Sequence, residues 1–179
     1  MLRAVELLAQ MHERARKMPN VPPAKLDRPV VLHSTALAFE TGKTQRAQVE
    51  RALGTAFSYP ARGWHTYATK ENGLACLLSA FYKDGTLVAA ELYVPRSDRA
   101  PALEPRDLGG FRLEPGGAAI GTRVEALPEL LTPASGGPGK VVYDEAFEAR
   151  FEGGVAYAMA RKGVIERLAL YAEISKPSA

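Results

Sequence analysis

The sequence predicts an α+β fold of two tandem units, each a short helix followed by a three- to four-stranded antiparallel sheet, with a helical arm at the N-terminus. Three observations lead to this prediction. Two similar stretches, residues 81–93 and 159–171, lie about 78 residues apart. Asn-Gly and Asp-Gly dipeptides, which favour tight hairpin turns, separate strand-like runs. Apolar and polar residues alternate within these runs, as they do on a strand with one buried face.

The similar stretches share identical residues at matched places, and these are Gly85 and Gly163, Leu92 and Leu170, and Tyr93 and Tyr171. Leu53 and Leu131 match at the same offset, and Gly42 and Gly121 match one residue beyond it. A repeat of this length is one supersecondary unit that is built twice. We therefore expect residues 30–95 and 118–179 to have the same order of elements, joined by a connection over residues 96–117.

The arm comprises residues 1–29. Apolar residues follow a helical spacing over residues 2–17, at Leu2, Val5, Leu8 and Met11. Pro19 ends the predicted helix, and the proline-containing segment after it is an extended linker. Such a helix docks on its own core or on a partner.

The first unit starts with an apolar strand-like run at residues 30–32. Residues 45–53 are predicted as a short helix that ends at Gly54. Strands are predicted at residues 64–69, 74–82 and 87–94. Turns at Asn72-Gly73 and Asp84-Gly85 separate these strands.

The second unit follows a connection that is rich in proline and glycine, with residues 111–113 as a candidate short strand. Its helix is predicted over residues 122–131, with Thr122 as N-cap and Glu125 at the capping-box position. Pro128 lies inside this range, so the helix is short or kinked. Strands are predicted at residues 141–151, 155–161 and 164–173, with Lys162-Gly163 as the last turn.

The composition of the chain excludes several classes of protein. Hydrophobic residues make up 46% and charged residues 24%, and no apolar run reaches the roughly 20 residues that span a bilayer. Acidic and polar residues interrupt the first turns, which disfavours a signal peptide. The single Cys76 excludes an internal disulfide and a multi-cysteine zinc site. These features favour a cytoplasmic protein that does not bind a membrane.

Ligand motifs are also missing. The net charge of +3 is concentrated in residues 1–30, which contain no aromatic residue, so nucleic-acid binding is not expected. Gly42-Lys43-Thr44 lacks the earlier glycine of a phosphate-binding loop. His12, His33 and His65 lie on three different predicted elements without metal-ligand spacing. We therefore expect no metal and no cofactor.

One predicted sheet face carries the candidate site. Glu91 and Arg167 mark this face as the wetter one, and Tyr93 and Tyr171 stand at matched places on it. The partner-binding set predicted from the sequence is His65, Tyr67, Glu91, Tyr93, Arg167 and Tyr171, with Tyr143 or Tyr157 nearby. Exposed tyrosines are typical of protein interfaces. They also brace solvated sheets through cross-strand pairs, which requires no partner.

The resulting hypothesis is a non-enzymatic protein-binding or inhibitory module that uses an exposed sheet face. One alternative is a small hydrolase that uses His65 with the carboxylate of Glu91 or Asp144. Another is a structural homodimer, similar to secretion chaperones, in which the N-terminal helix is exchanged between chains.

A family resemblance adds to this hypothesis. The helix with Gly42 and Val49, the Leu53-Gly54 pair at its end, and residues 64–67 (Trp-His-Thr-Tyr) resemble outer-membrane-assembly lipoproteins of the SmpA/OmlA type. The doubled form, over about residues 30–174, resembles the β-lactamase inhibitor protein fold. This resemblance implies one concave sheet that grips a protein partner.

Overall fold

The computed structural model describes residues 25–57, 63–96, 103–134 and 142–173. The predicted helix at residues 2–17 lies outside these ranges. Among the described residues, no helix has the length and the apolar character that crossing a membrane requires.

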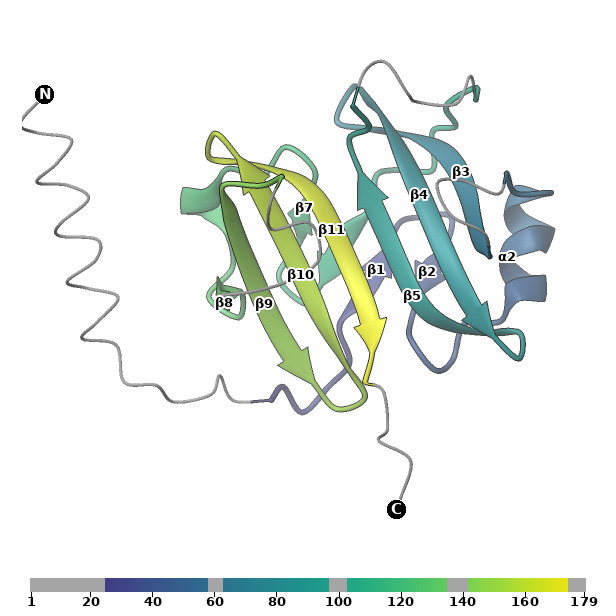
Figure 1. The fold of residues 1–179 in the computed structure, drawn as a ribbon, viewed down its shortest axis with the longest axis horizontal. Coiled ribbons are helices and arrows are strands. Elements are labelled where there is room, and N and C mark those ends of the chain that lie inside the picture. The colour runs from purple at the N-terminus through teal and green to yellow at the C-terminus, as the bar shows by residue number, and fades with distance from the viewer. Residues whose placement is uncertain (1–24, 58–62, 97–102, 135–141, 174–179) are drawn as a thin grey trace, which may run out of the picture.

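Two antiparallel sheets make up most of the fold (Figure 1). The large sheet has the strand order β3-β4-β5-β11-β10-β9-β8. Its strands are β3 (Trp64–Glu71), β4 (Leu74–Lys83), β5 (Thr86–Tyr93), β8 (Thr132–Pro133), β9 (Glu145–Phe151), β10 (Gly154–Arg161) and β11 (Val164–Ala172). The small sheet has the order β2-β1-β6-β7, from strands β1 (Val31–His33), β2 (Ala38–Phe39), β6 (Arg112–Glu114) and β7 (Ala118–Ala119).

Tight turns explain why the long strands pair with their sequence neighbours. Asn72 and Gly73 have φ values of 47° and 78°, and Asp84 and Gly85 have 52° and 79°. Two successive positive φ angles are typical of two-residue hairpin loops, whose twist matches that of the flanking strands. The hairpin turns predicted from the dipeptides are confirmed, and Lys162-Gly163 forms a third.

The predicted α+β class with two helix-plus-sheet units is wrong. The described residues contain one α-helix, α2 (Arg46–Leu53), and the range 122–131 holds only the three-residue 3-10 turn η1 (Val124–Ala126). Pro128 explains this difference, because it disfavours the helical conformation of the residue before it. Leu127 has φ −66° and ψ 142°, which is extended backbone.

The strands also assemble differently from the prediction. Those of both predicted units join one seven-stranded sheet, whose middle is the pairing of β5 with β11. In this pairing Glu91 lies opposite Ala169, and Tyr93 lies opposite Arg167. The segment predicted as a connection contributes β6, which pairs with β1 in the small sheet. Strands β5 and β11 are therefore interior strands, with at least two further strands on either side of the pair.

The core lies between the two sheets. In Figure 1 the small sheet lies behind the large one, and α2 lies beside β3. Leu78, Leu92 and Leu168 point from the large sheet into this core and are fully buried. The residues that meet them include Phe39 and Phe111 of the other layer. We call this side of the large sheet the inner face, and the opposite side the outer face.

Glu71 is a buried acid at the end of β3. It is 2% exposed, and its Oε2 accepts a hydrogen bond of 2.8 Å from the backbone N–H of Phe111. This bond ties the large sheet to the segment that leads into β6. Burial raises the pKa of Glu71 above its usual value, and the bond from Phe111 opposes part of that rise.

We predict that Glu71→Gln changes the pH dependence of stability. A raised pKa means that the folded chain holds the proton more tightly than the unfolded chain. The wild type therefore loses stability relative to the variant as the pH rises from about 4.5 through the raised value. Urea unfolding at pH 4.5 and pH 8 measures this, with the exposed Glu145→Gln as control. A constant difference between wild type and Glu71→Gln would contradict the prediction.

Candidate functional site

A polar cluster occupies the middle of the outer face. Strand alternation turns Glu91 and Tyr93 of β5 outward, together with Arg167 and Tyr171 of β11. Ala169 lies opposite Glu91 and has no long side chain. The Glu91 carboxylate therefore reaches diagonally to both neighbours of Ala169 on that face, Arg167 and Tyr171. We call Glu91, Tyr93, Arg167 and Tyr171 the central cluster.

Both oxygens of Glu91 are engaged in this cluster. Arg167 Nη2 lies 2.7 Å from Glu91 Oε2, and the Tyr171 hydroxyl donates a hydrogen bond to Glu91 Oε1. The two charged side chains are only 17% and 13% exposed. The Arg167 guanidinium also lies 5.7 Å from the centre of the Tyr93 ring, within cation–π distance. The charges are thus neutralised within the face itself.

Arg167 and Tyr171 each keep one protonation state at neutral pH. Burial lowers the pKa of Arg167, but the negative charge of Glu91 outweighs burial, and the pKa lies above its usual value. Burial and, after it, the charge of Glu91 raise the pKa of Tyr171. Arginine stays a cation and Tyr171 stays a hydroxyl donor. Neither side chain therefore exchanges a proton near neutral pH.

Aromatic side chains flank the cluster on the same face. Trp64 of β3 packs against Phe81 of β4 with ring centres 5.6 Å apart, and Phe81 is 36% exposed. Tyr157 of β10 meets Tyr171 edge-on at 6.0 Å. The outer face thus carries partly exposed aromatic rings from β3 to β10. We call Trp64, Phe81, Tyr93, Tyr157 and Tyr171 the aromatic outer face.

Four of the six predicted site residues, those of the central cluster, are brought together. His65 and Tyr67 are not, and their predicted place on the exposed face is wrong. The register of β3 on β4 pairs them with Ala80 and Leu78, which are inner-face residues. Tyr67 is 6% exposed, and its hydroxyl donates a 3.1 Å hydrogen bond to the Gly54 carbonyl.

His65 is also separated from the carboxylates of the hydrolase alternative. It packs edge-on against Tyr82 at 5.3 Å on the inner face, whereas Glu91 lies on the outer face. Asp144 lies beside β10, several strands away, where its Oδ2 accepts a hydrogen bond from the Lys162 N–H. Burial, followed by the charge of Arg46, lowers the pKa of His65. The proposed catalytic pairs do not form.

Trp64 and Phe81 are the outer-face residues that the sequence reasoning missed. Alternation within β3 does place Trp64 on the face opposite His65 and Tyr67. The sequence therefore placed Trp64 and His65 on opposite faces of β3. It did not give the register of β3 on β4 and of β4 on β5, which decides which of these faces contains Glu91 and Tyr93. Within the described ranges, no group of three or more His, Cys, Asp or Glu side chains is arranged to hold a metal ion.

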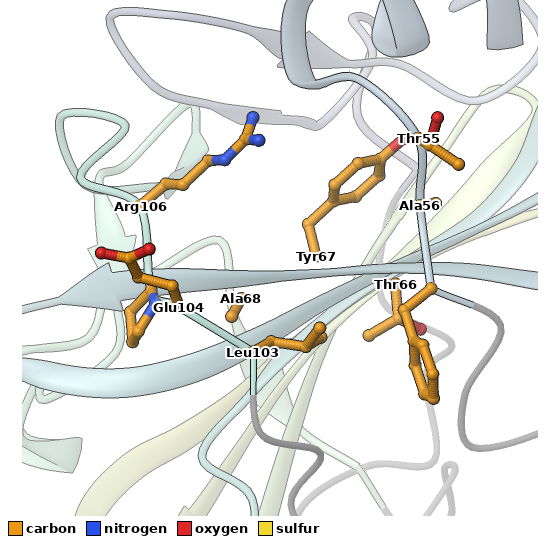
Figure 2. Close-up of a pocket in the computed structure, with 10 residues that line it drawn as sticks. Thr55, Ala56, Thr66, Tyr67, Ala68, Leu103, Glu104 and Arg106 are labelled. Carbon is orange, nitrogen blue, oxygen red and sulfur yellow. The ribbon is translucent and has the colours of Figure 1, made fainter.

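A second candidate site is a cavity of about 500 Å³ at the free edge of β3 (Figure 2). We call it the edge cavity. Its lining comes from the segment after α2, from β3 and from the segment before β6, and consists of Thr55, Ala56, Phe57, Thr66, Tyr67, Ala68, Leu103, Glu104, Pro105 and Arg106.

Comparisons with known proteins were made at three levels. No protein-family model matches the chain, and no match was found among the curated proteins or the solved structures. The resemblance to the β-lactamase inhibitor protein and SmpA/OmlA folds stays a prediction from short motifs.

Proposed function

We propose that this chain is a non-enzymatic protein-binding or inhibitory module that uses the outer face of the large sheet. The observation that carries the proposal is the aromatic outer face surrounding a nearly buried ion pair. Aromatic residues and arginine are enriched at the centres of protein interfaces. Here Tyr93, Tyr171 and Arg167 lie at the middle of the face, where a partner would exclude water most completely.

The state of the ion pair supports this proposal further. Covering an unpaired charge with a partner costs several kcal/mol. Glu91 and Arg167 already satisfy each other and are mostly buried before any partner arrives. A partner would therefore pay little additional desolvation at the centre, and could gain from contact with the flanking rings. This makes an apolar or aromatic partner surface the best match.

The partner would belong to the cytoplasm. Cys76 is the only cysteine of the sequence, and it is 1% exposed in β4. Burial, with a smaller effect from the charge of Glu71, raises the pKa of its thiol to about 12. A buried thiol of this kind is unreactive, and a fold without disulfides suits a reducing compartment.

We predict that the double variant Tyr93→Ala, Tyr171→Ala loses the partner. Each anchor at a true hot spot contributes about 2 kcal/mol or more, which is roughly a 30-fold loss of affinity for each. Affinity capture from native lysate with the wild-type chain identifies the partner, and calorimetry with the purified partner then measures the loss. Circular dichroism confirms that the variant is folded.

Two controls sharpen this experiment. Leu74→Ala removes an exposed apolar side chain, 47% exposed, that is not on the outer face, and it should leave the affinity unchanged. Tyr171→Phe keeps the ring but removes the hydroxyl that donates to Glu91, so it separates the contribution of the ring to the affinity from that of the hydroxyl. If the double variant holds the partner at wild-type affinity, the two tyrosines only brace the sheet and the proposal fails.

A further inference from the structure

The edge cavity lies where two segments cap β3 without covering it completely. Phe57 exchanges two backbone hydrogen bonds with Thr66, of 2.9 and 2.7 Å. Beyond it, the Arg106 N–H donates to the Ala68 carbonyl at 3.0 Å, and the Lys70 N–H donates to the Arg106 carbonyl at 2.9 Å. The backbone groups of Thr66, Ala68 and Lys70 therefore point away from β4, toward this edge.

One backbone donor remains at the gap between the two caps. By the same alternation the Ala68 N–H points toward the edge, and no acceptor among the described residues binds it. Thr66 already uses both of its backbone groups, and the Ala68 carbonyl is occupied. An added strand needs a row of free donors and acceptors. A single N–H instead suits one acceptor atom of a small molecule.

Arg106 adds a positive charge to the same cavity. One of its guanidinium nitrogens donates to the Leu53 carbonyl, at the end of α2, which holds the group in place. Within the described part of the chain, no carboxylate lies within ion-pair distance of Arg106, which keeps further N–H donors for a ligand. Figure 2 shows Arg106 and Tyr67 extending to the same side of β3, with the Tyr67 ring pointing toward Thr55.

The other walls limit the ligand further. Ala56, Phe57, Leu103 and Pro105 supply apolar surface, so the body of the ligand is apolar. Glu104 also lines the cavity, and its carboxylate repels anions, so a ligand with two negative charges is disfavoured more than one with a single charge. A volume of about 500 Å³ is within the usual range for small-molecule sites.

We propose that the edge cavity binds a small monocarboxylate with a compact apolar body. The carboxylate accepts hydrogen bonds from Arg106 and from the Ala68 N–H, and the apolar body packs against Ala56, Phe57 and Leu103. This site is separate from the central cluster on β5 and β11. The ligand-binding proposal is therefore independent of the protein-binding proposal.

The test uses the full chain, labelled with ¹⁵N, titrated with phenylacetate and with its neutral isostere phenylacetamide. Phenylacetate is expected to shift the Ala68 amide signal in a saturable way and to bind at least about tenfold more tightly than the amide. Arg106→Gln is expected to weaken phenylacetate binding about tenfold. The matched control Arg150→Gln, on β9 near the opposite edge, removes an exposed charge and should have no effect.

A second variant covers the case in which Arg106→Gln fails to fold. Ala68→Pro removes the N–H that points away from β4, at an edge position where proline is tolerated. It should abolish the preference for acid over amide while the melting curve stays cooperative. Equal affinity for phenylacetate and phenylacetamide, or equal weakening by Arg106→Gln and Arg150→Gln, overturns the proposal.

Discussion

Replacing Arg167 by methionine is expected to lower the free energy of unfolding by about 3 kcal/mol. The substitution leaves the Glu91 carboxylate at a place where its side chain is only 13% exposed and its main counter-ion is gone. Removing one partner of a buried pair is costly because the remaining charge is not compensated. The Tyr171 hydroxyl still donates to Glu91. The expected loss of unfolding free energy is therefore at the low end of the range for broken buried ion pairs.

A double-mutant cycle with Glu91→Gln tests this reason. The Glu91→Gln, Arg167→Met double variant should be clearly more stable in urea than Arg167→Met alone, because it contains no unpaired charge. The control Arg46→Met breaks an exposed pair of 2.7 Å with Glu50 on α2 and should cost under about 1 kcal/mol. If the double variant is no more stable than Arg167→Met, the loss comes from packing and not from the charge.

Replacing Leu168 by alanine is expected to destabilise the chain by about 3 kcal/mol. Leu168 of β11 is fully buried and lies opposite Leu92 of β5, at the junction between the two halves of the large sheet. Deleting its side chain leaves a cavity in the core and removes buried apolar surface. Because the junction joins both halves, one cooperative transition should shift as a whole.

Urea unfolding followed by fluorescence of the single Trp64 and by far-ultraviolet circular dichroism measures this effect. Trp64 lies on β3, at the edge of the sheet, so it reports on a strand remote from the mutation. The control Leu74→Ala, at an exposed position, should change stability by about 0.5 kcal/mol or less. Two separate transitions in the Leu168→Ala variant would show that the halves fold independently and would contradict the prediction.

The sequence alone determined the features that depend on neighbouring residues. Asn72-Gly73, Asp84-Gly85 and Lys162-Gly163 accept the backbone angles of tight turns, so the hairpins followed from dipeptides. Alternation within a single strand also placed Glu91 with Tyr93, and Arg167 with Tyr171. These are the side chains that meet in the central cluster.

Pairings between distant segments were decided only by the tertiary structure. Val31 lies opposite Glu114 in the small sheet, although the chain between them is long. No local pattern encodes such a pairing, because its stability comes from burial between layers rather than from turn chemistry. The short strand considered within the connection therefore became β6 of a second sheet that the sequence did not predict, and the α+β prediction was wrong.

The same reason explains the misplaced half of the candidate site. Alternation tells which residues of one strand share a face, but not which face of the next strand they join. That relation depends on register: Tyr67 lies opposite Leu78, and Leu78 lies opposite Leu92, which points into the core. Tyr67 therefore lies in the core while Trp64 lies outside, because the face of each strand is set by its partners across the sheet.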